Sequence, residues 1–228
     1  MLNLLLWIPF AVALLVAFAP RRAAAPLSFA GSLVTLGLAI ALIADFESGV
    51  PGLQHTVDES WIPELGVRYS LGIDGISLFL VAMTALLWAA CFAWAGLRQP
   101  DRPKNLFLML GIAEFGTLGA FLAQDLLLFV LFFDLMLIPF FFMIGSYGTG
   151  NRIQATIKMM IYTLVGSLLM LVGAIAAAVL TADGTGELSF AMADLRANLL
   201  SPGSQEWIFC FFAAAFLVKM PAFPLHGW

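Results

Sequence analysis

Charged residues, cysteine and histidine are all scarce in this chain. Only 11% of its 228 residues are charged, and it has two cysteines and two histidines. Cys91 and Cys210 lie alone within apolar segments, so they cannot frame a disulfide scaffold, a zinc site or an iron–sulfur cluster. His55 and His226 are far apart in the sequence, which argues against a haem or transition-metal centre. We therefore expect no metal and no redox cofactor on this chain.

Apolar residues dominate the composition of the chain. They make up 62% of the sequence, and the mean hydropathy is +1.01. These values predict an all-α polytopic membrane protein. The net charge of −4 and the absence of a dense Lys/Arg run exclude nucleic acid as a partner and leave the lipid bilayer as the expected surroundings.

Seven apolar segments are long enough to cross a hydrocarbon core of about 30 Å as helices. They are Leu2 to Ala19, Ala24 to Ala44, Ile73 to Gly96, Asn105 to Ala123, Leu126 to Gly145, Ile153 to Thr181, and Glu206 onward. Asp74, at the outer mouth of the third segment, is expected to cap its helix. The first segment lacks the positive n-region of a secretory signal, so we expect a retained helix.

The charges of the connecting loops predict an orientation, because Lys and Arg gather on the cytoplasmic side of short loops. One side collects Arg21, Arg22, Arg98, Arg102, Lys104, Arg152 and Lys158. The opposite loops hold two basic residues, Arg68 and Arg196, among many acids. We therefore expect the N-terminus outside, in the periplasm of a bacterial inner membrane.

Three charged side chains lie deep within these segments, namely Glu114, Asp134 and Lys219. At about 1.5 Å per residue, the two acids are about 14 Å from the ends of their helices, and Lys219 is about 20 Å from the outer end of its helix. A charge at such depth is costly and marks a functional site by default, so we predict ion or proton movement. The alternative is structural, with the acids joining helices and Lys219 reaching back to the membrane surface.

Prolines follow two of these residues. Pro221 and Pro224 cannot donate helical hydrogen bonds, so the seventh helix should break just past Lys219. In a membrane such a break is tolerated where protein or water satisfies the freed carbonyls, and we expect a hydrated cavity there. Pro139 should likewise free the carbonyl of Leu135, beside Asp134.

Four segments carry a resemblance to a known family. They are Leu71-Gly-Ile-Asp-Gly-Ile-Ser77, Phe132-Phe-Asp-Leu-Met-Leu-Ile-Pro139, Ile161-Tyr-Thr-Leu-Val-Gly-Ser167 and Val218-Lys-Met-Pro-Ala-Phe-Pro-Leu-His-Gly-Trp228. In this order they resemble chain M of NADH-quinone oxidoreductase, which is chain 4 of mitochondrial complex I. The Lys-Met-Pro segment separates this group from sibling antiporter-like chains.

The resemblance implies a proton-channel subunit of the membrane arm, built from two inverted repeats with a broken helix in each. Residues 1–100 would form an N-terminal three-helix region, and residues 105–228 the first repeat, truncated in its broken helix. Asp134 takes the place of the family's fifth-helix acid, usually Glu, and Lys219 that of its seventh-helix lysine. Glu114 matches an acid of many relatives. We predict that Lys219 carries the proton and that Asp134 controls how tightly it is held.

Two further residues are candidate participants. Lys158 lies about one turn into its helix, where an interfacial anchor is the simpler interpretation and a proton relay the alternative. His226 lies in the last matching segment. FMN, iron–sulfur clusters, NADH and quinone are expected on partner subunits, which include sibling antiporter-like chains. This chain would belong to a translocase without performing redox chemistry itself.

Relatives continue for about as many residues again, through a further lysine and a second broken helix. The chain is therefore expected to be an N-terminal fragment that does not pump alone. A multisubunit cation/proton antiporter and a membrane-bound hydrogenase remain alternatives, because both use similar subunits. A structural scaffold is the third, and it predicts that substitutions of Asp134 and Lys219 harm assembly rather than turnover.

Overall fold

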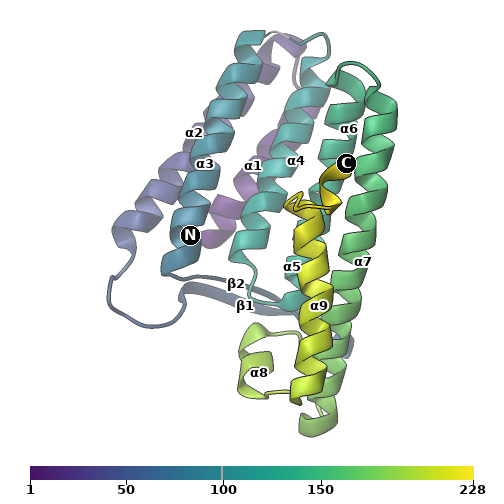
Figure 1. Ribbon diagram of the computed structural model, residues 1–228. Coiled ribbons are helices and arrows are strands. Elements are labelled where there is room, and N and C mark those ends of the chain that lie inside the picture. The colour runs from purple at the N-terminus through teal and green to yellow at the C-terminus, as the bar shows by residue number, and fades with distance from the viewer. Residues whose placement is uncertain (99) are drawn as a thin grey trace. The chain divides into compact units, whose positions relative to one another are not determined.

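The computed structural model describes residues 1–98 and 100–228, and helices occupy all seven predicted segments (Figure 1). The chain divides into two compact units. Helical unit 1 comprises Met1–Val57 and Leu71–Leu122, and helical unit 2 comprises Asp58–Ser70 and Ala123–Trp228. The predicted boundary between residues 100 and 105 concerns an internal repeat and stays a prediction.

Helical unit 1 contains four long helices: α1 (Leu2–Phe18), α2 (Arg21–Asp45), α3 (Gly75–Arg98) and α4 (Pro103–Leu122). Small residues let α1 approach its neighbours closely. A Cβ on Gly31 of α2 would lie 2.8 Å from the side chain of Val12, and one on Gly111 of α4 would lie 2.7 Å from the Cβ of Ala13. Close backbone approach through glycine is typical of helices packed within a membrane. Asp74 caps α3 as predicted, with its carboxylate accepting from the N–H of Ser77 at 2.7 Å.

Helical unit 2 contains α5 (Leu126–Leu135), α6 (Leu137–Tyr147), α7 (Arg152–Thr185), the short α8 (Met192–Ala197) and α9 (Pro202–Lys219). Helices α7 and α9 lie side by side (Figure 1). Their shared core with α5 is built on the buried side chains of Val130, Met170, Ala174 and Ala215. This packing places the end of α9 beside the end of α5.

The predicted continuous helix from Leu126 to Gly145 is interrupted at Met136. Helix α5 ends at Leu135 and α6 begins at Leu137. Pro139 explains the interruption, since it has no N–H for the carbonyl of Leu135. The interruption lies two residues after Asp134, and Met136 itself keeps right-handed helical dihedral angles (φ −62°, ψ −23°).

A two-stranded sheet and helix α8 were not expected from the sequence. Strand β1 (Gln54–Ile62) pairs with β2 (Val67–Ile73), and the connection is a single 3₁₀ turn (Pro63–Leu65) closed by Gly66. Gly66 has a φ of +63°, and a Cβ there would lie 1.9 Å from the carbonyl oxygen of Leu188. Glycine is therefore required for both conformation and space.

Within the described part of the chain, five helical stretches are long and apolar enough to cross a membrane. They are Arg21–Asp45, Gly75–Arg98, Pro103–Leu122, Leu126–Tyr147 and Arg152–Gly184. Helix α1 is apolar but shorter. Helix α9 begins at Pro202, four residues before the predicted start, and is capped by Ser201. Its first two turns include the polar residues Ser204, Gln205 and Glu206. The chain is thus a mostly helical membrane protein.

Candidate proton site at the ends of helices α5 and α9

Lys219 is the last residue of α9, where the sequence predicts the helix to break. Its side chain is partly buried, and Nζ donates a hydrogen bond of 2.5 Å to the carbonyl oxygen of Phe133 in α5. The same ammonium lies 3.5 Å from the centre of the Phe133 ring. A helix carries partial negative charge on its terminal carbonyls, so the end of α5 is a favourable place for a cation.

Asp134 follows Phe133 directly and interacts electrostatically with Lys219. Among the described residues, no ion pair within 4.0 Å joins the two side chains. The Oδ1 atom of Asp134 is buried and has no hydrogen-bond partner within the described part of the chain. Lys219 therefore donates to the backbone beside the acid, while one oxygen of the acid remains available to a water molecule or to a moved lysine.

The protein itself satisfies carbonyls freed by the break after Lys219. The N–H of Ala222 donates to the carbonyl oxygen of Leu217 at 3.0 Å. The indole N–H of Trp228 donates to the carbonyl oxygen of Val218 at 2.8 Å. Protein groups, rather than water alone, therefore hold the backbone at the end of α9.

A cavity of about 340 Å³ lies against Lys219. Its walls include Met136, Leu137 and Phe140 at the α5–α6 interruption, Met159 and Thr163 on α7, and Trp228. The hydroxyl of Thr163 donates to the carbonyl oxygen of Met159 at 2.7 Å and retains lone pairs that can accept. The cavity has room for several water molecules, but most of its wall is apolar, so the hydrated space expected beside Lys219 stays a prediction.

Lys158 and His226 do not line this cavity. Lys158 is exposed on α7, with Nζ 6.0 Å from the centre of the Tyr162 ring, and it lines a separate open groove with Arg152. His226 is exposed in the 3₁₀ turn Leu225–Gly227, and its ring lies 5.6 Å from that of Phe223. Their roles in proton movement remain predictions.

Glu114 lies in helical unit 1 and is buried on α4, with 1% of its surface exposed. It lines a small cavity together with residues of α1, α2 and α3. The structure thus confirms that Glu114 is a buried acid. The role of Glu114 in proton movement stays a prediction.

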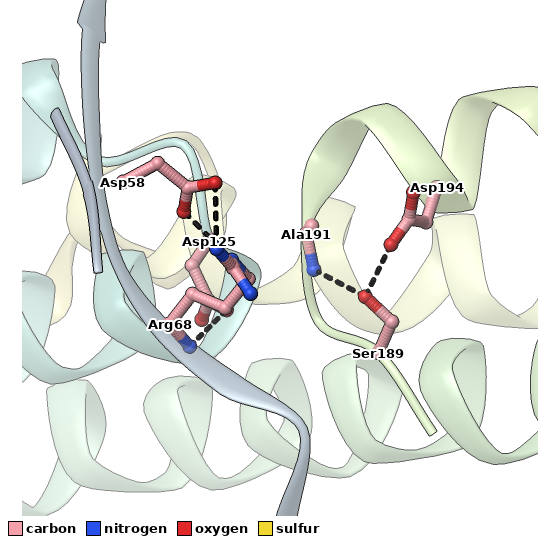
Figure 2. Close-up of polar contacts among 6 residues, drawn as sticks. All are labelled: Asp58, Arg68, Asp125, Ser189, Ala191 and Asp194. Carbon is pink, nitrogen blue, oxygen red and sulfur yellow. Dashed lines mark hydrogen bonds and ion pairs between the residues drawn. The ribbon is translucent and has the colours of Figure 1, made fainter. Parts of the chain in front are cut away.

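Asp125, the residue directly before α5, organises the start of that helix (Figure 2). Its Oδ1 accepts hydrogen bonds of 3.0 Å from the N–H groups of Leu127 and Leu128, and its Oδ2 accepts one of 3.0 Å from the N–H of Arg68. Burial raises the pKa of this carboxyl, and the three backbone N–H groups oppose that rise. An aspartate directly before an apolar run is a recognised helix-start signal, so this cap could have been predicted.

Two further contacts hold the segments around Asp125 (Figure 2). Arg68 forms a two-point ion pair with Asp58, at 2.7 and 2.8 Å. Ser189 donates to Asp194 at 2.6 Å and accepts from the N–H of Ala191 at 3.2 Å, which fixes the entry to α8. The hydrogen bond from Arg68 makes the pKa of Asp58 lower than its ordinary value. Strand β2 is tied to the start of α5 through Arg68 and Asp125, and the segment before α8 is tied to it through the N–H of Leu126, which donates to the carbonyl oxygen of Phe190 at 2.8 Å.

Residues 123–228 match the sequence profile of the family described as NADH:quinone oxidoreductase/Mrp antiporter, transmembrane. The F(420)H(2) dehydrogenase subunit M of Methanosarcina mazei is 34% identical over 99% of the chain and 46% of its own length. The NADH-quinone oxidoreductase subunit M of Rhodobacter capsulatus is 36% identical over 100% of the chain and 47% of its own length. The chain thus spans just under half the length of these relatives.

Solved structures show the same fold. A chain of respiratory complex I from Thermus thermophilus with bound NADH superposes with a TM-score of 0.86 at 32% identity, covering 100% of this chain and 46% of its own. A chain of the Mrp complex from a Dietzia species superposes with a TM-score of 0.81 at 19% identity, covering 100% of this chain and 24% of its own. The second likeness concerns the fold alone.

Proposed function

Because the chain belongs to the NADH:quinone oxidoreductase/Mrp antiporter transmembrane family, we propose that it forms part of a proton-translocating membrane-arm subunit of NADH-quinone oxidoreductase. Its part in that enzyme is to carry protons, coupled to NADH oxidation and quinone reduction on partner subunits. NADH, FMN, iron–sulfur clusters and quinone belong to those partners. Sibling antiporter-like chains are its neighbours in the membrane arm.

One observation carries this proposal, namely the contact of the Lys219 ammonium with the carbonyl of Phe133, one residue before Asp134. Lys219 holds the proton, and the charge of Asp134 controls how tightly it is held. A nearby carboxylate stabilises the ammonium, and its withdrawal or neutralisation leaves a partly buried cation without compensation. The proton then leaves into the cavity lined by Thr163.

The proposed orientation of the chain in the membrane follows from the charges of its loops. The N-terminus lies outside, in the periplasm if the membrane is a bacterial inner membrane, and the basic loops face the cytoplasm. Glu114, Lys158 and His226 are further proposed participants in proton movement.

The test replaces Lys219 by Met in the full-length subunit within its assembled complex. Met keeps most of the length of the side chain and removes the ammonium. We expect NADH-driven acidification of membrane vesicles to be lost while the complex still assembles on a native gel. Lys104→Met, near the start of α4, is the matched control and should pump normally. Unchanged pumping by Lys219→Met would refute the carrier role.

A cation/proton antiporter is the second candidate, because the description of the matching family also names the Mrp antiporter. It predicts that a sodium gradient acidifies vesicles without any NADH dehydrogenase. A membrane-bound hydrogenase would use the same site with different partner proteins, which co-purification would identify. Loss of assembly in the Lys219 variant would instead favour the structural scaffold.

A further inference from the structure

Helical unit 1 contains a small internal cavity beside Glu114. Its walls come from all four helices and include Pro9, Ala13, Ser28, Ser32, Phe92 and Gly111. Its volume, counted as the space that the centre of a water molecule can occupy, is about 10 Å³. A polar cavity of about that size holds a single water molecule.

Two buried polar atoms at this cavity lack a partner. The Oε1 atom of Glu114 and the Oγ atom of Ser28 have no hydrogen-bond partner within the described part of the chain. Glu114 is 1% exposed and Ser28 is 2% exposed, so bulk water does not reach either side chain. Buried polar groups are rarely left unpaired, and each such atom calls for a bound molecule or ion. One water molecule between them can satisfy both.

No opposite charge faces Glu114 from the described residues of the surrounding helices. Helix α1 carries no ionisable side chain. The charged residues of α2 and α3 lie in their first or last turns, at Arg21, Arg22, Asp45 and Arg98. Lys104 lies in the first turn of α4 itself. An ionised carboxylate buried without a partner is strongly unfavourable, and the usual outcome is that the group binds a proton.

We propose that this cavity is a proton-binding site in which Glu114 is a neutral carboxylic acid that shares one buried water molecule with Ser28. A protonated carboxyl both donates and accepts, and a water molecule can match it while also bonding the serine hydroxyl. The inference does not depend on the roles of Asp134 and Lys219.

This cavity suits a protonated carboxyl group and one water molecule better than it suits a sodium ion. Hard cations of this kind take about six oxygen ligands. The side chains here offer the carboxyl of Glu114 and two serine hydroxyls, and Ser32 already donates to the carbonyl oxygen of Phe29 at 2.8 Å. Sodium is therefore the competing outcome that the experiment must distinguish.

The experiment is infrared spectroscopy of the intact complex in membranes near neutral pH, comparing the parent protein with Glu114→Gln. We expect a carbonyl stretch of a neutral carboxylic acid that is absent in Glu114→Gln and present in Asp134→Asn. Ser28→Ala should shift this band, because it removes a partner of the bound water. Ser32→Ala is the matched control and should leave the band in place, since its hydroxyl already has an acceptor. Native gels verify assembly of each variant.

Three results would overturn the proposal. A spectrum of the parent protein identical to that of Glu114→Gln in the neutral-acid region would mean that Glu114 is ionised. A band that disappears when sodium is added would identify a cation site. A band unmoved by Ser28→Ala would show that the serine and the acid share no water molecule.

Discussion

The Lys219 ammonium lies on the main chain of α5, 2.5 Å from the carbonyl oxygen of Phe133. Helix α9 ends at this lysine, and α5 ends two residues after the phenylalanine. The end of α9 contributes the ammonium and the end of α5 contributes the carbonyl group. Such a carbonyl is available because the last carbonyl groups of a helix have no partner inside the helix. The contact needs no surface loop, so it is as rigid as the packing of α5, α7 and α9 around Ala215 and Met170.

Asp134 is expected to control pumping through charge and not through shape. Asp134→Asn keeps the size of the side chain and removes the charge, so we expect pumping to slow about tenfold or more, since about 1.4 kcal/mol in a barrier is tenfold in rate. Asp134→Glu lengthens the side chain by one bond of about 1.5 Å and should retain pumping, because it keeps the negative charge. Initial rates of NADH-driven vesicle acidification, divided by NADH oxidation, measure both. Equal rates for the Asn variant and the parent would remove Asp134 from the mechanism.

Asp125 is expected to contribute more to stability than any exposed acid of the chain. Asp125→Ala removes three hydrogen bonds to backbone N–H groups, and we expect a loss of about 2 to 3 kcal/mol in unfolding free energy. Asp125→Asn should lose only about 1 kcal/mol, because its remaining oxygen can still cap α5 while its NH₂ group faces the N–H of Arg68. Thermal unfolding in detergent gives the order of the variants. Identical midpoints for Ala and Asn would contradict the cap on α5, and identical midpoints for Asn and the parent would contradict the bond to Arg68.

Gly66 should be far less tolerant of substitution than Gly150, although both have nearly the same positive φ. Their φ angles are +63° and +64°, but a Cβ on Gly66 would lie 1.9 Å from the Leu188 oxygen, whereas none of the surrounding atoms lies within 4 Å of a Cβ on Gly150. Gly150→Ala should therefore cost only the left-handed strain of about 1 to 2 kcal/mol. Gly66→Ala must also displace the Leu188 backbone, and we expect at least about 3 kcal/mol. Unfolding midpoints in detergent decide the matter, and similar losses in the two variants would count against the close approach.

The Asp58–Arg68 ion pair predicts a small pH dependence. The pKa of Asp58 is lowered by the hydrogen bond from Arg68, so the pair stabilises the folded state above the ordinary aspartate pKa. That contribution is lost as the pH falls through the lowered value. The pair is half-exposed, so we expect the unfolding midpoints of the parent and Asp58→Asn to differ by at most a few degrees at neutral pH. The difference should vanish in strong acid and shrink in high salt, and a difference that grows in acid would have the wrong sign.

Hydropathy and proline placement were sufficient to predict much of the fold. The seven helical segments, the cap at Asp74 and the end of α9 at Lys219 depend on local sequence, because helix length, capping and loss of an N–H act within a few residues. The interruption at Met136 also has a local cause in Pro139. We expected that proline to free a carbonyl but did not predict that it would divide the helix.

Long-range contacts could not be obtained in this way. Asp125 bonds Arg68 across 57 residues, and Lys219 bonds Phe133 across 86. Nothing in the local pattern near Asp125 indicates that β2 will supply its third hydrogen-bond donor. The two-stranded sheet was not predicted either, although its turn is local, and the fit of Gly66 against the carbonyl oxygen of Leu188 is seen only in the tertiary structure.

The sequence by itself determined that this is a helical membrane protein with Glu114, Asp134 and Lys219 deep in its apolar segments, because hydropathy and depth follow from residue order. Only the tertiary structure decided which atoms these side chains meet. It directed the Lys219 ammonium to the Phe133 carbonyl rather than to an ion pair with Asp134, and it placed Ser28 with Glu114 at one small cavity. The physical reason is that helix packing selects contacts among side chains of suitable size and position, and residue order alone does not specify that selection.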